Sequence, residues 1–408
     1  MVPDRSVPAV AVAVYYDVGM RSEPEGRTGF AHLFEHLMFQ GSAGLEKLEH
    51  SRHVQSAGGV FNGTTHLDYT NYYELVPSNA LERMLFLEAD RMRGPRITPE
   101  NLANQIAVVK EEIRVNVLNR PYGGFPWLTL PPLLFSTFPN AHNGYGDFVD
   151  LEAATVDDAT GFFRRYYAPS NALLCIAGDI ETDATVELVE RHFGGIASRR
   201  KPVRSPLSEA GIDAEHHETI TDAHAPLPAV ATAWRVPDPV IDLAAYLPFV
   251  VLAEVLTDGD SSRLQHRLVR ADRIATQVGG YLGFLGDPFD VRDPTAMLLS
   301  AVHPPDVPAK RVLAAIDEEM ERLSGDGVDR GELGRVTTRL AAQILRELDS
   351  VLGRAQAAAS LQLVHDRAGL VGELPELVGR VTDAQVRGAA AALRPDRRAV
   401  SELLAGAA

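Results

Sequence analysis

Residues 31–39 constrain this chain more than any other stretch. They read Ala-His-Leu-Phe-Glu-His-Leu-Met-Phe, so two imidazoles and one carboxylate stand among apolar side chains. If the segment is helical, His32 and His36 lie at positions i and i+4 on one face, with Glu35 beside them. A helix that is apolar on nearly every side is buried, and titratable groups inside it need partners. The segment therefore predicts a buried helix with a polar site built into it.

The order of these residues indicates a metal site, because His-x-x-Glu-His is the inverzincin signature. Zinc in a hydrolase usually has three protein ligands and a water. His32 and His36 supply two ligands, which leaves Glu35 to take a proton from the attacking water. The third ligand must come from elsewhere, and the helix that holds Glu111 and Glu112 is the strongest source. One of these two carboxylates should face the site, because neighbours on a helix are about 100° apart.

The order of elements repeats along the chain. A chain of 408 residues is too long for one ordinary core. A predicted strand at 8–17 and the motif helix at 28–39, with Thr28 as its N-cap, have counterparts at 229–236 and 243–256. The second helix has no histidine. We therefore predict an α+β protein with two homologous domains, each a mostly antiparallel sheet packed with helices.

The predicted boundaries place a metal-binding catalytic domain at 1–205, a linker at 206–217 and a homologous domain without metal at 218–408. Further elements complete the prediction: a hairpin within 58–77, helices at 78–93, 98–118, 307–324 and 329–350, and strands at 172–177 and 398–404.

Composition excludes several classes of partner. The chain has 39 basic and 55 acidic residues and a formal charge of −16, which disfavours nucleic acid. It has no apolar run of about 18 residues, so we expect no contact with a membrane. The N-terminus lacks a signal-peptide pattern, which predicts a cytoplasmic location. The single cysteine, Cys175, falls in an apolar run and is predicted to be a buried strand residue.

Four stretches together resemble the pitrilysin-type (M16) metallopeptidases, in particular the bacterial and mitochondrial-processing-peptidase branch. They are the motif at 32–36, Asn-Gln-Ile-Ala-Val-Val-Lys-Glu-Glu at 104–112, Asn-Arg-Pro-Tyr-Gly at 119–123, and 166–172 with Ala-Gly-Asp at 177–179. The resemblance implies two homologous domains per subunit, two subunits that close around a peptide chamber, and one zinc ion per chain. It also implies that His32, His36 and Glu112 bind the zinc and that Glu35 is the catalytic base.

The sequence departs from the family pattern at two positions outside the motif. Gln105 stands seven residues before Glu112, where the family often has a glutamate, and we expect it to support the site as a neutral hydrogen-bond partner. In the second half the family often has arginine followed seven positions later by tyrosine. Arg270 matches the arginine, whereas Gln277 replaces the tyrosine.

Substrate contacts are predicted at a sheet edge, because an extended peptide gains main-chain hydrogen bonds by pairing with an exposed strand. In the resemblance the strand at 59–64 occupies that edge. Asn62 is the candidate contact, although an asparagine that caps a turn is an equal alternative. Arg270 is the candidate contact in the second half.

We therefore predict a zinc-dependent endopeptidase that cleaves unfolded peptides or leader segments. The incomplete arginine–tyrosine pair predicts that a homologous subunit completes the protein, as a heterodimer or a homodimer. The alternatives are a non-catalytic assembly subunit and a peptide-binding subunit of the same fold. The intact set of His32, Glu35, His36 and Glu112 favours catalysis, because a scaffold has no physical reason to keep a base beside three ligands.

Overall fold

The computed structural model describes residues 1–285 and 287–406, which form two compact units. Unit 1 comprises Met1–Glu112, Asn143–Ser205 and Leu345–Val371, and unit 2 comprises Ile113–His142, Pro206–Ile344 and Gly372–Ala408. The predicted domains run in chain order, whereas each unit gathers three separate stretches. The passage from Ser205 to Pro206 is the one place where a predicted boundary and a unit boundary coincide.

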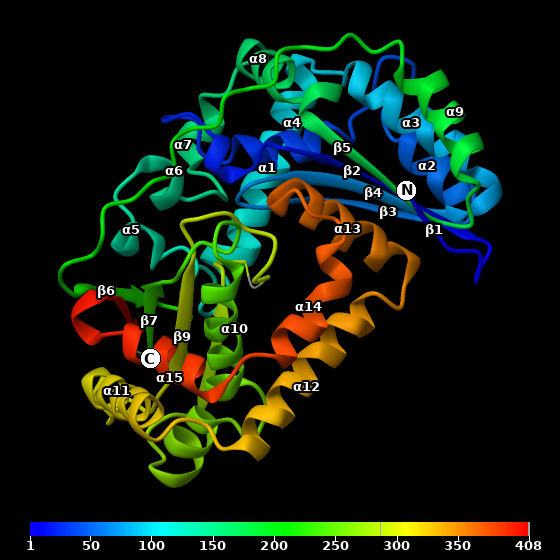
Figure 1. Ribbon diagram of the computed structural model, residues 1–408. Coiled ribbons are helices and arrows are strands. Elements are labelled where there is room, and N and C mark those ends of the chain that lie inside the picture. The colour runs from blue at the N-terminus through cyan, green and yellow to red at the C-terminus, as the bar shows by residue number, and fades with distance from the viewer. Residues whose placement is uncertain (286, 407–408) are drawn as a thin grey trace. The chain divides into compact units, whose positions relative to one another are not determined.

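Each unit contains one five-stranded sheet, and the strands of the two sheets follow corresponding orders. Figure 1 shows the strands of both units. In unit 1 the order is β1-β5-β2-β4-β3, with β1 parallel to β5 and all other pairs antiparallel. In unit 2 the order is β6-β10-β7-β9-β8, and only β6 and β10 are parallel. The strands are β1 Val2–Pro3, β2 Ala9–Tyr16, β3 Val60–Thr65, β4 Thr70–Pro77, β5 Ala172–Gly178, β6 His216–Asp222, β7 Ala229–Arg235, β8 Gln277–Leu282, β9 Ala296–Val302 and β10 Ala399–Ala405. The predicted fold class is confirmed.

Strand β2 is buried on both faces, which explains its nearly continuous apolar sequence. Val10 and Val12 pack in one cluster with residues of α3 (Leu81–Arg93). Ala11 and Ala13 point to the opposite face and pack in a second cluster with α13 (Val351–His365). Figure 1 shows α13, drawn in orange, beside this sheet. Helix α13 falls within the predicted second domain, 218–408, although it belongs to unit 1. Its alanine-rich sequence does not indicate which sheet it packs on.

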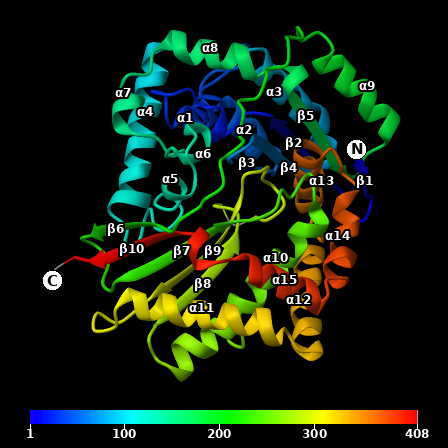
Figure 2. The same ribbon diagram turned by 60° about the vertical axis from the view of Figure 1, so that its left-hand side comes forward.

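In unit 2 the helix α10 (Leu243–Thr257) follows β7 and precedes β8, as α1 (Phe30–Leu37) follows β2 and precedes β3. It packs on β8, while α11 (Ala309–Asp326) packs on β7 and against α15 (Asp383–Ala392), an arrangement visible in Figure 2. The other α-helices are α2 Glu49–Ser56, α4 Pro99–Ile113, α5 Pro131–Leu134, α6 Phe138–Ala141, α7 Phe148–Glu152, α8 Val156–Tyr166, α9 Thr182–Phe193, α12 Arg330–Glu347 and α14 Leu370–Gly379.

The predicted strands and long helices are confirmed within a few residues at their ends. Several elements were not predicted, including the helices α2, α5–α9 and α13–α15. Strand β6 begins at His216, inside the predicted linker, and the hairpin of β8 and β9 was missed. Strand β8 reads Gln-Val-Gly-Gly-Tyr-Leu, and two glycines in six residues weaken the strand signal. Cys175 is buried in β5, as predicted.

Among the helices in the described part of the chain, none combines the length and the apolar character that crossing a membrane requires. The cytoplasmic location stays a prediction.

A buried charged cluster lies in unit 1 between α2, α3 and β4. The guanidinium of Arg91 contacts Glu88 and lies 3.6 Å from a carboxylate oxygen of Glu74, while the Nε2 atom of His50 lies 3.1 Å from the same Glu74 oxygen. All four side chains are buried. Burial raises the pKa of Glu74, raises the pKa of Glu88 well above its ordinary value, and lowers the pKa of His50 to about 3. The single cation Arg91 therefore faces two carboxyl groups whose pKa values are both raised by burial.

The raised pKa of Glu88 gives the stability of unit 1 a pH dependence that Glu88→Gln should change. A carboxyl group with a raised folded-state pKa contributes stability below its ordinary pKa of 4.5, and this contribution is lost as the pH rises through the folded-state value. Glutamine stays neutral and still accepts a hydrogen bond from Arg91. We expect the melting temperature of Glu88→Gln, relative to wild type, to rise between pH 5 and pH 9 in thermal unfolding.

The control is Glu100→Gln, which changes an exposed carboxylate on α4 and should follow the wild-type curve at every pH. Arg91→Met leaves a buried charge unpaired and should cost about 3–5 kcal/mol. Parallel pH curves for wild type and Glu88→Gln would contradict the raised pKa of Glu88.

Candidate metal centre

A carboxylate from the segment that precedes the motif helix α1 caps its N-terminus. Glu23 accepts hydrogen bonds from the backbone N–H groups of Gly29 and Ala31, at 2.8 and 2.7 Å. A carboxylate at this end also complements the helix dipole. The prediction that Thr28 caps the helix is wrong, because the N-cap is Gly29 and the Thr28 hydroxyl donates to Asp150 at 2.8 Å instead.

A contact between two glycines fixes a loop against the start of α1. Gly29 has φ +80°, and a Cβ atom on it would lie 2.6 Å from the Cα atom of Gly146. Only residues without a side chain allow the two backbones to approach so closely. The contact brings Tyr145 beside the motif, where its ring lies 5.1 Å from the His32 ring and its hydroxyl donates to Glu112 at 3.3 Å.

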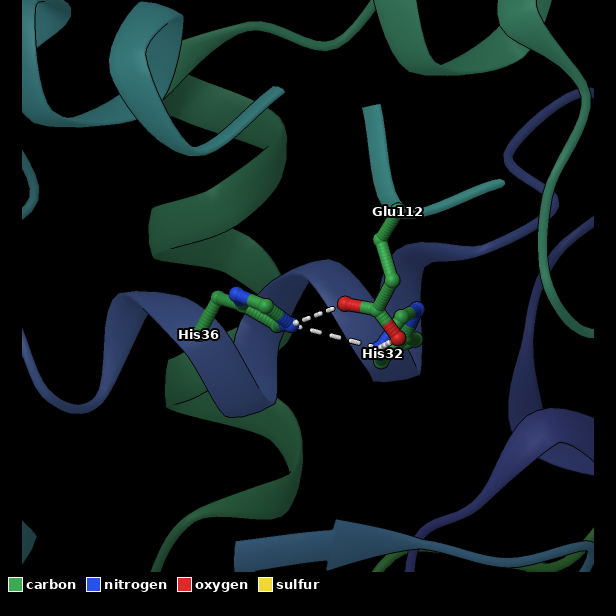
Figure 3. A group of neighbouring side chains, drawn as sticks. All are labelled: His32, His36 and Glu112. Carbon is green, nitrogen blue, oxygen red and sulfur yellow. Dashed lines mark hydrogen bonds and ion pairs between the residues drawn. The ribbon is translucent and has the colours of Figure 1, made fainter. Parts of the chain in front are cut away.

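Three donor atoms converge from α1 and α4 (Figure 3). The Nε2 atoms of His32 and His36 are 3.2 Å apart. One oxygen of Glu112 lies 3.4 Å from Nε2 of His36, and the other lies 3.6 Å from Nε2 of His32. Two ligands bound tetrahedrally at about 2.0–2.1 Å are separated by roughly 3.3 Å. The separation of the two Nε2 atoms fits a zinc-sized tetrahedral ion, and Glu112 lies close enough to supply one oxygen as the third ligand.

The protonation states of these groups also suit a metal. Burial and the neighbouring His36 lower the pKa of His32 to about 4, so its imidazole is neutral at pH 7. A hydrogen bond with His36 is the main cause that lowers the pKa of Glu112, which keeps it a carboxylate. Metal ligands must be deprotonated in this way. In the described part of the chain Glu112 pairs with no lysine or arginine, so its charge is available to a cation.

Glu35 lies beside these donors without being one of them. It is mostly buried, and this burial raises the pKa of its carboxyl group, while a hydrogen bond from the Thr65 hydroxyl, at 2.7 Å, opposes the rise. A raised pKa suits a group that takes up and releases a proton near neutral pH. Strand β3 lies directly against it, since a Cβ atom on Gly63 would be 3.2 Å from Cγ of Glu35.

The cluster of His50, Glu74 and Glu88 also has three possible ligand atoms within 4.8 Å of one another. Arg91 already occupies the position of the cation there, in contact with Glu88 and 3.6 Å from Glu74. A metal ion beside a buried guanidinium would be repelled. The group of His32, His36 and Glu112 is therefore the candidate metal centre of the described residues.

The remaining predicted site residues lie elsewhere. Gln105 is buried and donates to Asn104 at 2.8 Å, with no hydrogen bond to the three donors. Asn62 is exposed on β3. Arg270 lies on the π-helical turn Gln265–Ala271 and pairs with Asp260 at 3.4 Å, and Gln277 is the first residue of β8. The roles of Gln105, Asn62 and Arg270 stay predictions.

Two residues beside the site were missed by sequence reasoning. Tyr145 reaches Glu112 from 33 positions away, and Thr65 reaches Glu35 from 30 positions away. The one local signal for Tyr145 is its place between Gly144 and Gly146, which predicts a close backbone approach without naming what is approached.

Known families account for most of the chain. Residues 2–121 match the family described as Insulinase (Peptidase family M16), and residues 153–340 match the Peptidase M16 inactive domain. The zinc protease PqqE of Helicobacter pylori is 27% identical over 371 residues, which are 88% of this chain and 80% of that protein. Subunit 1 of the mitochondrial cytochrome b-c1 complex of Bos taurus is 25% identical over 57% of this chain and 49% of its own length.

Among solved structures, a protease from Helicobacter pylori superposes with a TM-score of 0.89 at 24% identity, over 98% of this chain and 95% of that one. This likeness shows the fold. The matching sequence regions and the repeated sheet define a two-domain peptidase fold, and the chain belongs to the pitrilysin-type M16 family. The relatives of this chain include proteins named zinc proteases as well as a subunit of the cytochrome b-c1 complex.

Removing one donor should test the candidate metal centre. We expect one zinc per wild-type chain, measured by elemental analysis after dialysis against buffered zinc. Glu112→Ala should lower the zinc affinity by more than the 10- to 100-fold that loss of a residue supporting a ligand costs. Zinc at about 100 times its dissociation constant should stabilise wild type by about 2.7 kcal/mol, and this gain should disappear in the variant.

The matched control is Glu111→Ala, which removes the exposed neighbouring carboxylate on the same helix and should bind zinc as wild type does. Equal zinc affinity of Glu112→Ala and Glu111→Ala would exclude Glu112 as a ligand.

Proposed function

We propose that this chain is a zinc-dependent endopeptidase that cleaves unfolded peptides or leader segments. The observation that carries the proposal is the convergence of His32, His36 and Glu112 within 3.2–3.6 Å beside the buried Glu35. Membership of the M16 family and the likeness to PqqE, a protein named a zinc protease, support it.

In this proposal His32, His36 and Glu112 hold one zinc ion per chain. Zinc supplies the Lewis acidity that lowers the pKa of water to about 7 and polarises a peptide carbonyl group. Glu35 accepts the proton of the attacking water and passes it to the nitrogen of the leaving amine. The desolvation that raises the pKa of Glu35 makes its carboxylate a stronger base toward the attacking water.

The proposed substrate contact is strand β3, which ends the sheet of unit 1 and pairs only with β4. Its other edge offers backbone N–H and C=O groups to an extended peptide, and such pairing needs no fixed sequence. Asn62, exposed on this strand, is the proposed side-chain contact. Most extended segments of a folded protein already pair with their own sheet, whereas an unfolded peptide has free backbone groups along its length, so we propose unfolded peptides as substrates.

We further propose that the chain is the catalytic member of a dimer with a homologous subunit. Helix α10 occupies the place of α1 in the repeated order and has no histidine, and Gln277 stands where the family often has tyrosine. Arg270 is the proposed substrate contact in this half. A heterodimer is favoured by the complete donor set beside the incomplete arginine–tyrosine pair, and a homodimer is the other arrangement.

A non-catalytic assembly or peptide-binding subunit is the second candidate function. The match of residues 153–340 to an inactive domain and the likeness to a cytochrome b-c1 subunit favour it. The donor set and the base weigh against it, since buried titratable groups without a ligand cost stability.

Glu35→Gln separates the two candidates. Glutamine has nearly the same size and cannot accept a proton, so we expect the variant to keep its zinc and to lose peptide cleavage by about 100- to 10,000-fold. The assay is the hydrolysis of an unfolded peptide library followed by mass spectrometry, with Glu111→Gln as the control. Equal cleavage rates for wild type and Glu35→Gln would exclude the proposed mechanism.

The mass of the purified protein tests the proposed dimer. Chain purified from its native host should have about twice its own mass in light scattering, and mass spectrometry should identify a homologous second subunit. Full cleavage activity from a monomeric chain would contradict the need for a partner.

A further inference from the structure

The hydroxyl group of Thr65 makes a hydrogen bond to Glu35 that the expected site did not include. Its Oγ1 atom lies 2.7 Å from Oε2 of Glu35, and Glu35 receives no other hydrogen bond from the described residues. Resting on the proposed function, we propose that Thr65 is a positioning residue that aims the carboxylate of the base. Thr65 fixes Oε2 and leaves Oε1 to accept the proton.

The hydrogen bond restricts rotation about the terminal torsion of the Glu35 side chain, which would otherwise be free. The terminal torsion of a glutamate side chain is broad and roughly two-fold, so an unrestrained carboxylate exchanges its two oxygens and swings between them. The distance of 2.7 Å lies within the range of hydrogen bonds from a hydroxyl to a carboxylate, which are stronger than those between neutral groups. Proton transfer depends on the distance and direction of the accepting oxygen, so holding the carboxylate contributes to the rate and not to the binding of substrate.

Thr65 is itself held by the hairpin. It is the last residue of β3 and pairs with Thr70, and the next residue, His66, donates from its backbone N–H to the Tyr69 carbonyl at 2.8 Å. Successive side chains in a strand point to opposite faces. Thr64 accordingly makes its hydrogen bond to Asn71, while Thr65 faces α1. The register of the hairpin therefore decides which hydroxyl reaches the base.

The same strand packs against the base through its backbone. A Cβ atom on Gly63 would lie 3.2 Å from Glu35 and 3.2 Å from Phe39. Phe39 in turn packs on Phe61 of β3, with ring centroids 5.7 Å apart. Strand β3 therefore forms the proposed edge for the peptide and also holds the group that acts on it, so a peptide paired with β3 is in fixed register with Glu35.

The test compares zinc-loaded wild type, Thr65→Val and Thr65→Ser in steady-state peptide cleavage. Valine keeps the shape and the branched Cβ atom and lacks the hydroxyl. We expect the kcat of Thr65→Val to fall about 10- to 100-fold, as for other residues that orient a catalytic group, with KM and zinc content unchanged. Thr65→Ser restores the hydroxyl and should restore kcat.

The matched control is Thr185→Val. Thr185 is buried in α9 of the same unit, and its hydroxyl donates to the Glu181 carbonyl at 2.7 Å, so the variant loses a bond of equal length away from the site. It should cleave peptides at the wild-type rate. A wild-type kcat for Thr65→Val, an effect confined to KM, or an equal loss in Thr65→Val and Thr65→Ser would overturn the proposal.

A second readout needs no activity. In crystal structures of the metal-free proteins, the Glu35 carboxylate should take one position in wild type and in Thr65→Ser and several in Thr65→Val. One position in all three would overturn the role of Thr65. If wild type cleaves no peptide while the carboxylate behaves as expected, the proposed function fails and the positioning by Thr65 stands.

Discussion

The spacing of three donor atoms is the constraint on which the rest of unit 1 depends. Nε2 of His32 and Nε2 of His36 lie 3.2 Å apart in a largely buried site, with oxygens of Glu112 at 3.4 and 3.6 Å. Two imidazoles and a carboxylate that converge in a partly buried site lose hydration, and a cation bound between them would offset this loss. The capping by Glu23, the contact of Gly29 with Gly146 and the packing of β3 on α1 hold this arrangement in place.

The two units have corresponding five-stranded sheets but carry different side chains on the helix that follows the second strand of each unit. In unit 1 the helix after the second strand carries the donors, and in unit 2 the corresponding helix, α10, is apolar and buried along most of its length. Unit 1 also contains the cluster of Arg91, Glu74, Glu88 and His50, whose charges balance without a metal. Unit 1 thus contains two groups of side chains whose spacing would suit metal ligands. The guanidinium of Arg91 balances the charge in one of them, and among the described residues no guanidinium contacts the three donors of the candidate metal centre.

Sequence reasoning succeeded where the relevant spacing is local. The i and i+4 positions of His32 and His36 follow from helix geometry, and the repeated order of strands and helices predicts two similar halves. Glu112 was one of two adjacent candidates on geometry, and the family resemblance selected it. The hydrogen bond of Thr65 to Glu35 and the packing of α13 on β2 join residues that are 30 or more positions apart. Residue type alone does not indicate which of these residues meet. The prediction that Thr28 caps the helix was wrong, because a more distant carboxylate, that of Glu23, accepts hydrogen bonds from the backbone at the helix N-terminus.

Anomalous X-ray scattering at the zinc absorption edge, from a crystal of the zinc-loaded protein, tests the central claim most directly. We predict one anomalous peak per chain, about 2.0–2.2 Å from His32, His36 and Glu112. A peak between His50, Glu74 and Glu88, or no peak in unit 1, would contradict the assignment of the metal centre.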